Sequence, residues 1–260
     1  MAKSLSRRIG ALMKLAFVVL GMHRSGTSSL AGLLAQLGAT APKTLMSPKP
    51  ENPKGFWESE VLMAFNNEIL VRAQSSWDDS LPLDNSVFEG EQGEDLRQRA
   101  AQKLTEEFGD AQTIVLKDPR ICRFYPFWRQ VLEAQGYTPF PILIVRPPQE
   151  VAASLHGRNG MPIAEGLALW RRHVEDAEVT SREQPRKIIL WKDLLNNWQA
   201  TLAGIETKLG RPVSHPDENS LAKADGFLSP ELSKHLGQIL PQPDTESLAL
   251  YEQMVRLAQT

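Results

Sequence analysis

The chain has 260 residues, of which 29 are lysine or arginine and 31 are aspartate or glutamate, so its formal net charge is 29 − 31 = −2. A nearly neutral chain lacks the basic excess that is typical of nucleic-acid-binding proteins. Charged residues make up 23% and hydrophobic residues 42%, which is ordinary for a folded domain and excludes a disordered one. The single cysteine, Cys122, excludes an internal disulfide and a multi-cysteine metal site.

The first residues superficially resemble a signal peptide, because basic residues precede an apolar run from Ile9 to Gly21. Lys14 interrupts this run, and no small-residue cleavage site follows it. The run is also shorter than the roughly 20 apolar residues that a membrane span needs. We therefore expect a cytoplasmic protein with one domain over residues 1–260, in which residues 1–14 form a flexible leader.

Four short apolar runs predict buried β-strands. Their hydrophobic residues are nearly continuous rather than alternating, a pattern typical of parallel strands that are covered on both faces. The predicted strands are Ala16–Leu20, Thr113–Leu116, Ile142–Val145 and Lys187–Trp191.

Helical patterns lie between and after these strands. A helix is predicted over Thr27–Leu37, where leucines recur at i, i+3, i+4 and i+7 before Gly38. Strands that alternate with helices predict right-handed βαβ units and an α/β three-layer sandwich with a central parallel sheet. The other predicted helices are Val61–Ala73, Glu94–Glu107, Phe124–Ala134, Gln149–Leu155, Ile163–Ser181, Leu194–Leu209 and Ser247–Leu257.

A glycine-rich turn follows the first predicted strand and reads Gly21-Met22-His23-Arg24-Ser25-Gly26-Thr27-Ser28. Both glycines and Ser28 fit the nucleotide-binding pattern G-x-x-x-x-G-K-[ST], but Thr27 stands where that pattern has lysine. The N–H groups of such a turn surround an anion at the positive end of a helix. Because an ATP-using loop needs the lysine and this loop instead carries Arg24, the sequence predicts a different anionic ligand.

Polar residues also follow the other three strands, at the sheet edge where α/β proteins bind ligands. Arg146 ends the third strand and Ser154 lies eight residues later, which predicts a second anion site. Lys117-Asp118-Pro119-Arg120 follows the second strand, and Asp118 is expected to cap the next segment or to hold Arg120. Trp191 ends the fourth strand, where it either stacks on a base or packs in the core.

Taken together, these motifs resemble the sulfotransferases that use 3′-phosphoadenosine 5′-phosphosulfate (PAPS). The Arg24–Ser28 run is similar to the 5′-phosphosulfate loop of the tyrosylprotein and glycan branches, and Arg146 with Ser154 resembles the family's 3′-phosphate site. The resemblance covers Phe17 to Leu209 and implies a P-loop nucleoside-triphosphate-hydrolase-like fold of the sulfotransferase type. It implies PAPS as the sulfuryl donor, no metal, and donor binding by Arg24, Ser25, Gly26, Thr27, Ser28, Arg146, Ser154 and Trp191.

The resemblance also implies catalytic roles. Arg24 and Lys117 would balance charge on the leaving phosphate, and Lys117 would also assist the bridging oxygen or the sulfuryl group. Many members use a glutamate on the segment after the first helix as general base. The candidates here are Glu51, Glu58 and Glu60, and we favour Glu58 because the aromatic pair before it would partly desolvate its carboxylate. His23 is the rival base, since an imidazole with an ordinary pKa of about 6.5 suits proton transfer.

One departure from the family concerns the C-terminal region, which has no Arg-Lys-Gly element of the kind that cytosolic small-molecule members use on the 3′-phosphate. Lys223 and Lys234 are the candidates to replace it. From the branch resemblance we expect a carbohydrate or other glycan-type hydroxyl acceptor, and we expect the long loops Ala39–Phe56 and Ser75–Gly93 to shape its cleft. The alternatives are a nucleotide-dependent kinase or NTPase of the same fold and a non-catalytic nucleotide-binding protein.

Overall fold

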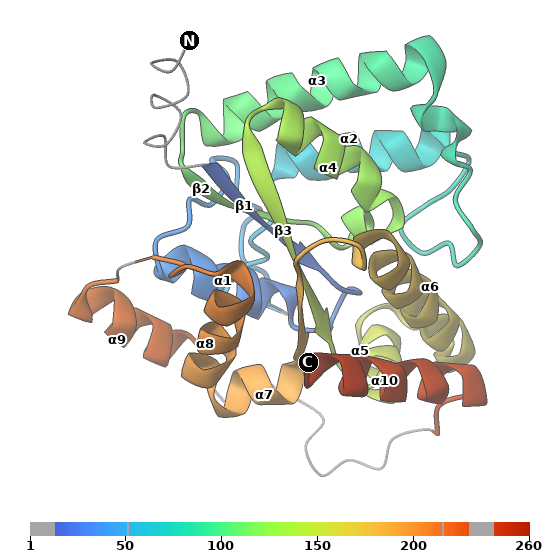
Figure 1. The fold of residues 1–260 in the computed structure, drawn as a ribbon. Coiled ribbons are helices and arrows are strands. Elements are labelled where there is room, and N and C mark those ends of the chain that lie inside the picture. The colour runs from blue at the N-terminus through green and yellow to red at the C-terminus, as the bar shows by residue number, and fades with distance from the viewer. Residues whose placement is uncertain (1–13, 51, 215, 229–241) are drawn as a thin grey trace.

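The computed structural model describes residues 14–50, 52–214, 216–228 and 242–260 (Figure 1). The predicted leader lies outside the described residues except for Lys14, which begins the first strand. The strands are β1 (Lys14–Leu20), β2 (Thr113–Lys117), β3 (Tyr137–Val145) and β4 (Lys187–Leu190). The helices are α1 (Thr27–Gln36), α2 (Glu60–Arg72), η1 (Asn85–Phe88), α3 (Gly90–Phe108), η2 (Pro119–Phe124), α4 (Tyr125–Ala134), α5 (Pro148–Asn159), α6 (Ile163–Ser181), α7 (Trp191–Asn196), α8 (Trp198–Leu209), α9 (Glu218–Phe227) and α10 (Thr245–Ala258).

The four strands form one parallel sheet in the order β2-β1-β3-β4. Strand β1 is central, and its residues from Ala16 to Leu20 are completely buried, as their continuous apolar run predicts. Thr40 adds a single parallel bridge to Ile114 at the β2 edge. All four strands therefore deliver their carboxyl ends to the same edge of the sheet.

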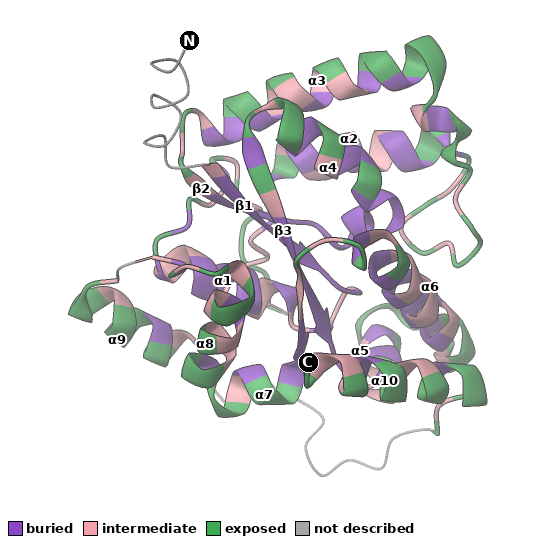
Figure 2. Cartoon of the chain, viewed as in Figure 1, coloured by how far each residue is buried: buried purple, intermediate pink, exposed green. Residues whose placement is uncertain are grey.

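Helices cover both faces of this sheet. Along β1 the side chains of Ala16, Val18 and Leu20 enter one hydrophobic core, with residues of α2, α3, α4, α5, α6 and α10. Those of Leu15, Phe17 and Val19 enter a second core with α1, α8 and α9. Figure 2 shows the buried strands between the two helical layers. The predicted three-layer α/β sandwich is confirmed.

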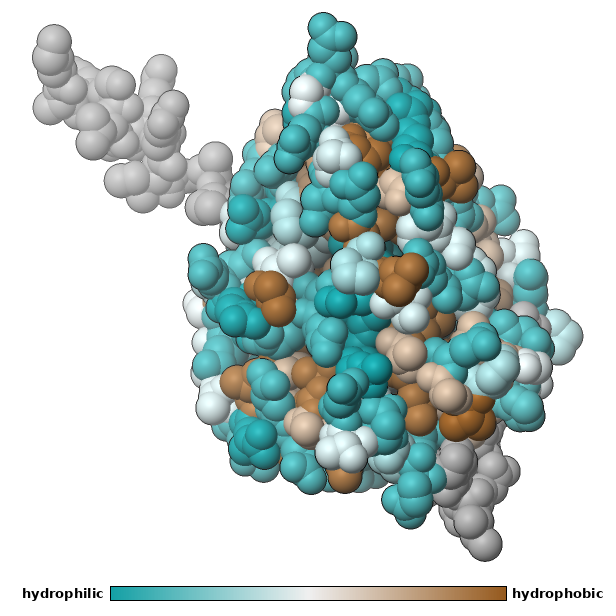
Figure 3. Space-filling model, turned by 90° about the vertical axis from the view of Figure 1, so that its right-hand side faces the viewer, coloured by the Kyte–Doolittle hydropathy of each residue, from teal (hydrophilic) through white to brown (hydrophobic). Residues whose placement is uncertain are grey.

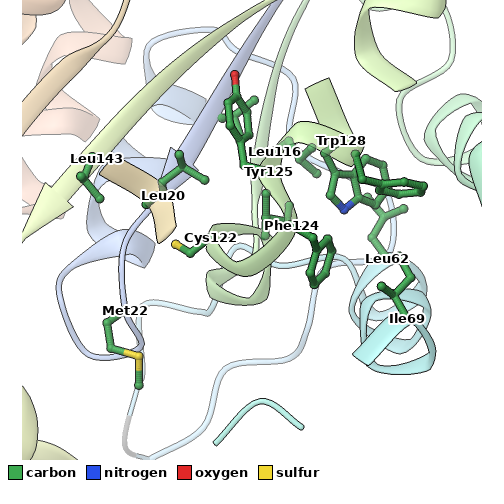
Figure 4. Packing of buried hydrophobic residues seen from close by; sticks show 14 of the residues in the cluster. Leu20, Met22, Leu62, Ile69, Leu116, Cys122, Phe124, Tyr125, Trp128 and Leu143 are labelled. Carbon is green, nitrogen blue, oxygen red and sulfur yellow. The ribbon is translucent and has the colours of Figure 1, made fainter. Parts of the chain in front are cut away.

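The first core is rich in aromatic residues from η2 and α4 (Figure 4). Phe124, Tyr125 and Trp128 are almost completely buried, and the Trp128 indole N–H donates to Asn66 Oδ1 at 2.9 Å. The Cys122 side chain lies in the same core, where its Sγ accepts the Gly21 N–H at 3.0 Å. This bond ties the start of the glycine-rich turn to the core.

Several element boundaries differ from the sequence prediction: α3 begins four residues before the predicted Glu94 and α5 ends four residues after the predicted Leu155, and the larger differences lie at β3 and after β4. Strand β3 begins five residues earlier than predicted, at Tyr137, and includes Pro139 and Pro141. Both prolines lie in the part of β3 that pairs with β1 but not with β4. Their missing N–H groups therefore interrupt no hydrogen bonds between β3 and β4. Trp191 opens α7 rather than ending β4, and the helix predicted over Leu194–Leu209 is interrupted at Asn197, whose side chain caps α8. Helix α9 was not predicted.

The surface in Figure 3 is mainly hydrophilic, with hydrophobic side chains singly or in small groups. Within the described ranges, none of the helices combines the length and the apolar composition that crossing a bilayer requires.

Candidate functional site

A pocket of about 310 Å³ lies at the carboxyl edge of the sheet. This is the edge at which open α/β sheets bind ligands, and the volume lies at the small end of ordinary ligand pockets, roughly 300–1,000 Å³. Residues that follow all four strands reach the pocket. It is lined by His23, Arg24, Gly26, Thr27, Ser28, Ser29, Pro50, Asn52, Pro53, Lys54, Phe56, Glu58, Lys117, Pro119, Arg146, Arg158 and Trp191.

Two glycines let the turn after β1 pass closely around the pocket. Gly21 has φ +145°, and a Cβ there would lie 2.6 Å from the Ile144 carbonyl oxygen. Gly26 is the N-cap of α1 with φ +94°, and a Cβ there would lie 2.1 Å from the Trp191 ring. No side chain caps α1, and the first N–H groups of a helix have no partner within the helix. These donors are therefore available to an anion at the positive end of α1, and the anion site stays a prediction.

Arg24 joins the two predicted anion sites. Its backbone is left-handed, with φ 70°, a strained conformation for arginine. Its Nε donates to Ser154 Oγ at 2.9 Å, and its carbonyl oxygen accepts from Arg146 Nη1 at 3.1 Å. The structure therefore brings Arg146 and Ser154 together around Arg24 rather than in direct contact with each other.

Arg146 carries a buried donor beside the α1 terminus. Its Nε donates to Glu150 at 2.7 Å, whereas its Nη2 is buried with no hydrogen-bond partner among the described residues. Its guanidinium carbon lies 5.8 Å from the centre of the Trp191 ring. A guanidinium with a buried, unused N–H suits an anionic ligand, so the residues present fit the phosphates of PAPS.

Trp191 contributes to both the pocket and the core. Only 4% of its surface is exposed, and it belongs to the second hydrophobic core, where its ring lies against Gly26. Core packing is therefore its main role in this structure, and stacking on a base stays a prediction.

Arg158 is a pocket residue that the sequence reasoning missed. It lies four residues after Ser154 on α5, hence on the same side of the helix, and its guanidinium lies 5.1 Å from the centre of the Trp77 ring. Its position four residues after Ser154, the spacing of neighbours on one face of a helix, is the feature of the sequence that could have identified it. Arg158 adds a third guanidinium to the group formed by Arg24 and Arg146.

A buried ion pair lies between the loop and the sheet. Lys117 Nζ is 2.5 Å from Glu58 Oε1, and the two residues are only 4% and 5% exposed. The same ammonium donates to Phe56 O at 3.0 Å and to Ser28 Oγ at 3.2 Å. Burial raises the pKa of Glu58, and the Lys117 charge opposes this rise without reversing it.

A second cation, Arg120, is fixed near the same carboxylate. Its Nη1 lies 3.7 Å from Glu58 Oε2. Asp118 accepts from the Arg120 N–H at 3.0 Å and from its Nη1 at 2.9 Å, which confirms the expected role of Asp118 in holding Arg120. Asn66 and Asn67, which the sequence did not single out, complete the network through bonds of 2.9 Å to Asp118 and 2.6 Å from Arg120 Nε.

His23 lines the pocket as a neutral imidazole. Its Nε2 is buried without a hydrogen-bond partner in the part of the chain that the structure describes. Burial lowers its pKa well below the ordinary value of 6.5, and Arg120 lowers it further. An imidazole that binds protons so weakly is a poor general base, whereas the raised pKa of Glu58 favours the carboxylate in that role.

The remaining predicted residues are placed as follows. Thr27 and Ser28 line the pocket; Ser25 is completely buried, with an unpartnered hydroxyl, and does not line it. Glu60 is exposed at the start of α2, and Lys223 is exposed on α9 away from the pocket. Glu51 and Lys234 lie outside the described residues.

Of the two long loops expected to shape the cleft, only Ala39–Phe56 contributes described residues to the pocket lining, and no residue of Ser75–Gly93 does so. Ala39–Phe56 lines it directly through residues such as Asn52 and Phe56. The Ser75–Gly93 segment is anchored by Arg123, which donates to Asp79 O at 2.6 Å and Leu81 O at 2.5 Å and pairs with Asp176 at 2.8 Å. This anchoring places Trp77 edge-on to His23, with ring centres 5.2 Å apart.

No protein-family model and no curated protein matches the sequence. Solved structures do match in fold. The sulfotransferase domain of the Synechococcus PCC 7002 olefin synthase has a TM-score of 0.54 at 16% identity, over 93% of this chain and 94% of that domain. The sulfotransferase domain from the curacin biosynthetic pathway gives 0.53 at 15% identity, over 93% and 98%. The sulfotransferase STF9 from Mycobacterium avium gives 0.51 at 16% identity, over 98% and 79%. The chain therefore has the α/β fold of the sulfotransferases.

Proposed function

We propose that this protein is a PAPS-dependent sulfotransferase that acts on an acceptor hydroxyl. The observation that carries the proposal is the position of Lys117, whose ammonium bonds at once to Ser28 of the anion-binding loop and to the buried Glu58. One cation thus connects the site for a leaving phosphate with a carboxylate that can take a proton. Sulfuryl transfer needs these two functions side by side.

The donor would be held by two groups of residues. The N–H groups at the start of α1, with Thr27, Ser28 and Arg24, suit the 5′-phosphosulfate. Arg146 and Ser154 suit the 3′-phosphate, and Arg158 lies one helical turn away from Ser154. Bound PAPS would supply the activated sulfuryl group. Among the described residues no group of three His, Cys, Asp or Glu is placed to hold a metal ion, and metal independence stays a prediction.

In the proposed reaction Glu58 accepts the acceptor's hydroxyl proton as the acceptor oxygen bonds to sulfur. The bond between sulfur and the 5′-phosphate oxygen breaks, and Lys117 with Arg24 stabilises the charge left on that phosphate. The products are the sulfate ester, 3′-phosphoadenosine 5′-phosphate (PAP) and a proton on Glu58. The proposed acceptor class, a carbohydrate or other glycan-type hydroxyl, follows from the branch resemblance alone and from no single residue of the pocket.

The test is thermal unfolding with PAP, AMP, and ATP with and without Mg²⁺. A ligand at 100 times its dissociation constant adds about 2.7 kcal/mol to stability, which is readily seen as a melting shift. We expect PAP to stabilise the protein without metal and far more than AMP does. Stabilisation by Mg-ATP alone would favour a kinase or NTPase. PAP binding without transfer to a broad acceptor panel would favour a non-catalytic nucleotide-binding protein.

A further inference from the structure

We propose that the acceptor is an uncharged hydroxyl compound, not an acidic glycan or an acidic peptide. This inference rests on the proposed function and comes from the charges that line the pocket. Among the residues that the structure describes, the lining has five cationic side chains and one carboxylate, that of Glu58, so the formal charge of these residues is 5 − 1 = +4. The cations are Arg24, Lys54, Lys117, Arg146 and Arg158.

The negative charge of the donor alone would balance this positive charge. A phosphate monoester carries roughly −1.5 to −2 near neutral pH, and the phosphosulfate of PAPS adds about −2, so the donor brings a charge of about −4. Arg146 is in addition already paired with Glu150 at 2.7 Å. With the donor in place, the pocket has no surplus cation for an anionic acceptor.

The rest of the lining is uncharged. Pro50, Pro53, Phe56 and Pro119 present apolar surface, and His23 is held neutral by burial. An ionised group placed against such surface loses hydration without gaining a partner.

The carboxylate at the reaction centre also disfavours a negatively charged acceptor. Glu58 is almost completely buried, and a negative acceptor beside it would repel the charged form that has to take the proton. A neutral hydroxyl carries no charge and meets no such repulsion.

The test compares acceptors in pairs that differ only in charge. Suitable pairs are methyl glucoside with methyl glucuronide, 4-ethylphenol with 4-hydroxyphenylacetate, and a tyrosyl peptide flanked by glycine with one flanked by glutamate. We expect the neutral member to have a kcat/KM at least about tenfold higher, the size of effect of one unbalanced charge near a partly buried group. For pairs that turn over too slowly, thermal unfolding of the PAP-bound protein with each member gives the same comparison. Equal or better performance of the anionic members would overturn the inference.

A variant tests the same idea by adding charge. Phe56 contributes its backbone carbonyl to Lys117 and Ser28, so a side-chain change there leaves those bonds available. Phe56→Lys should shift the neutral-to-anionic ratio about tenfold toward the anionic member, whereas Phe56→Leu should leave the ratio unchanged. An unchanged ratio in Phe56→Lys would contradict the inference. PAP binding is measured first in every protein: a wild type that does not bind PAP contradicts the proposed function, and one that binds PAP but prefers anionic acceptors contradicts only the inference.

Discussion

Lys117 Nζ and Glu58 Oε1 are 2.5 Å apart although the two residues are brought together from the end of β2 and from the turn before α2, 59 positions apart in sequence. Both are buried, and removing one partner from a buried pair leaves an uncompensated charge. The choice of substitution therefore decides whether an experiment tests catalysis or stability.

Glu58→Gln should lower turnover at least about a hundredfold, since a neutral amide cannot take the acceptor proton. Lys117 keeps its bonds to Phe56 and Ser28, so the affinity for PAP should stay close to that of the wild type. The measurements are kcat with PAPS and the dissociation constant of PAP. Glu60→Gln, at an exposed neighbouring position, is the control and should behave as wild type.

The pH dependence of the same reaction gives a second prediction. Burial raises the pKa of Glu58 above 4.5, so the acid limb of the kcat profile should have its midpoint above pH 4.5. Activity should fall as pH decreases through this limb, because Glu58 becomes protonated, and Glu58→Gln should lack the limb. An acid limb that persists in Glu58→Gln would assign proton transfer to another group.

Arg146→Ala should weaken PAP binding about tenfold to a hundredfold, the range of a hydrogen bond to a charged group, while AMP binding changes little. The reason is that the guanidinium is predicted to bind the 3′-phosphate, which AMP lacks. Calorimetric titration with both nucleotides measures the effect. Arg72→Ala removes an exposed guanidinium on α2 and should change neither affinity. Equal losses for PAP and AMP would place Arg146 at the 5′ end of the donor.

His173→Asn should flatten the dependence of stability on pH. His173 is completely buried, and burial lowers its pKa to about 3, so the folded protein keeps it neutral while the unfolded chain binds a proton near pH 6.5. The contribution of neutral His173 to the free energy of unfolding is therefore fully present above pH 6.5 and is lost as the pH falls toward about 3. Between about pH 7.5 and pH 5.5 the wild type should lose about 1.4 kcal/mol more than the variant in urea unfolding. Asparagine can keep the bond to Leu169 O. Parallel curves would show that the pKa of His173 is the same in the folded and the unfolded protein.

Gly26→Ala should abolish PAP binding and lower the melting temperature. A Cβ at Gly26 would lie 2.1 Å from the Trp191 ring, in a residue whose φ is +94°. Gly160→Ala is the matched control, because Gly160 also has a positive φ, +74°, but no atom lies within 4 Å of the added Cβ. It should cost about 1 kcal/mol from backbone strain alone and leave PAP binding intact. Similar losses in the two variants would mean that the contact with Trp191 is unimportant.

Cys122→Ala should destabilise the protein by about 1–3 kcal/mol, because the buried Gly21 N–H loses its acceptor. Burial raises the pKa of Cys122 to about 12, so the group replaced is a neutral thiol. Cys122→Ser offers a smaller acceptor. Compared with Cys122→Ala, it should recover part of the lost stability in denaturant unfolding and part of any lost PAP affinity. If serine and alanine behave alike, the sulfur acts by filling space.

The sequence predicted the four strands and the glycine turn after β1, because both depend on short-range patterns. Continuous apolar runs placed all four strands, and the two glycines of the turn after β1 each have a steric reason in the structure. Helix α9 was missed, since its buried face is small and only Ala224 is buried within it.

Long-range contacts set the limit of sequence reasoning in the site. Glu58 was selected among three glutamates for its aromatic neighbours, but its burial comes from Lys117 and Arg120, which lie about 60 residues later. Asn66 and Asn67 show no motif in the sequence, because their role depends on the distance of α2 from η2. The low pKa of His23 likewise arises from burial and from cations on other elements.

The anchoring of Ser75–Gly93 by Arg123 has a consequence for how this segment is positioned beside His23, a residue of the pocket. Arg123 lies in η2 and its carboxylate partner Asp176 in α6, so the carbonyl oxygens of Asp79 and Leu81 meet a correctly placed guanidinium only after η2 and α6 have docked. Trp77, which lies in the same anchored segment, packs edge-on against the His23 ring. The susceptibility of this segment to a protease is therefore a reporter of tertiary integrity at the pocket, and it can be read in any variant without a substrate.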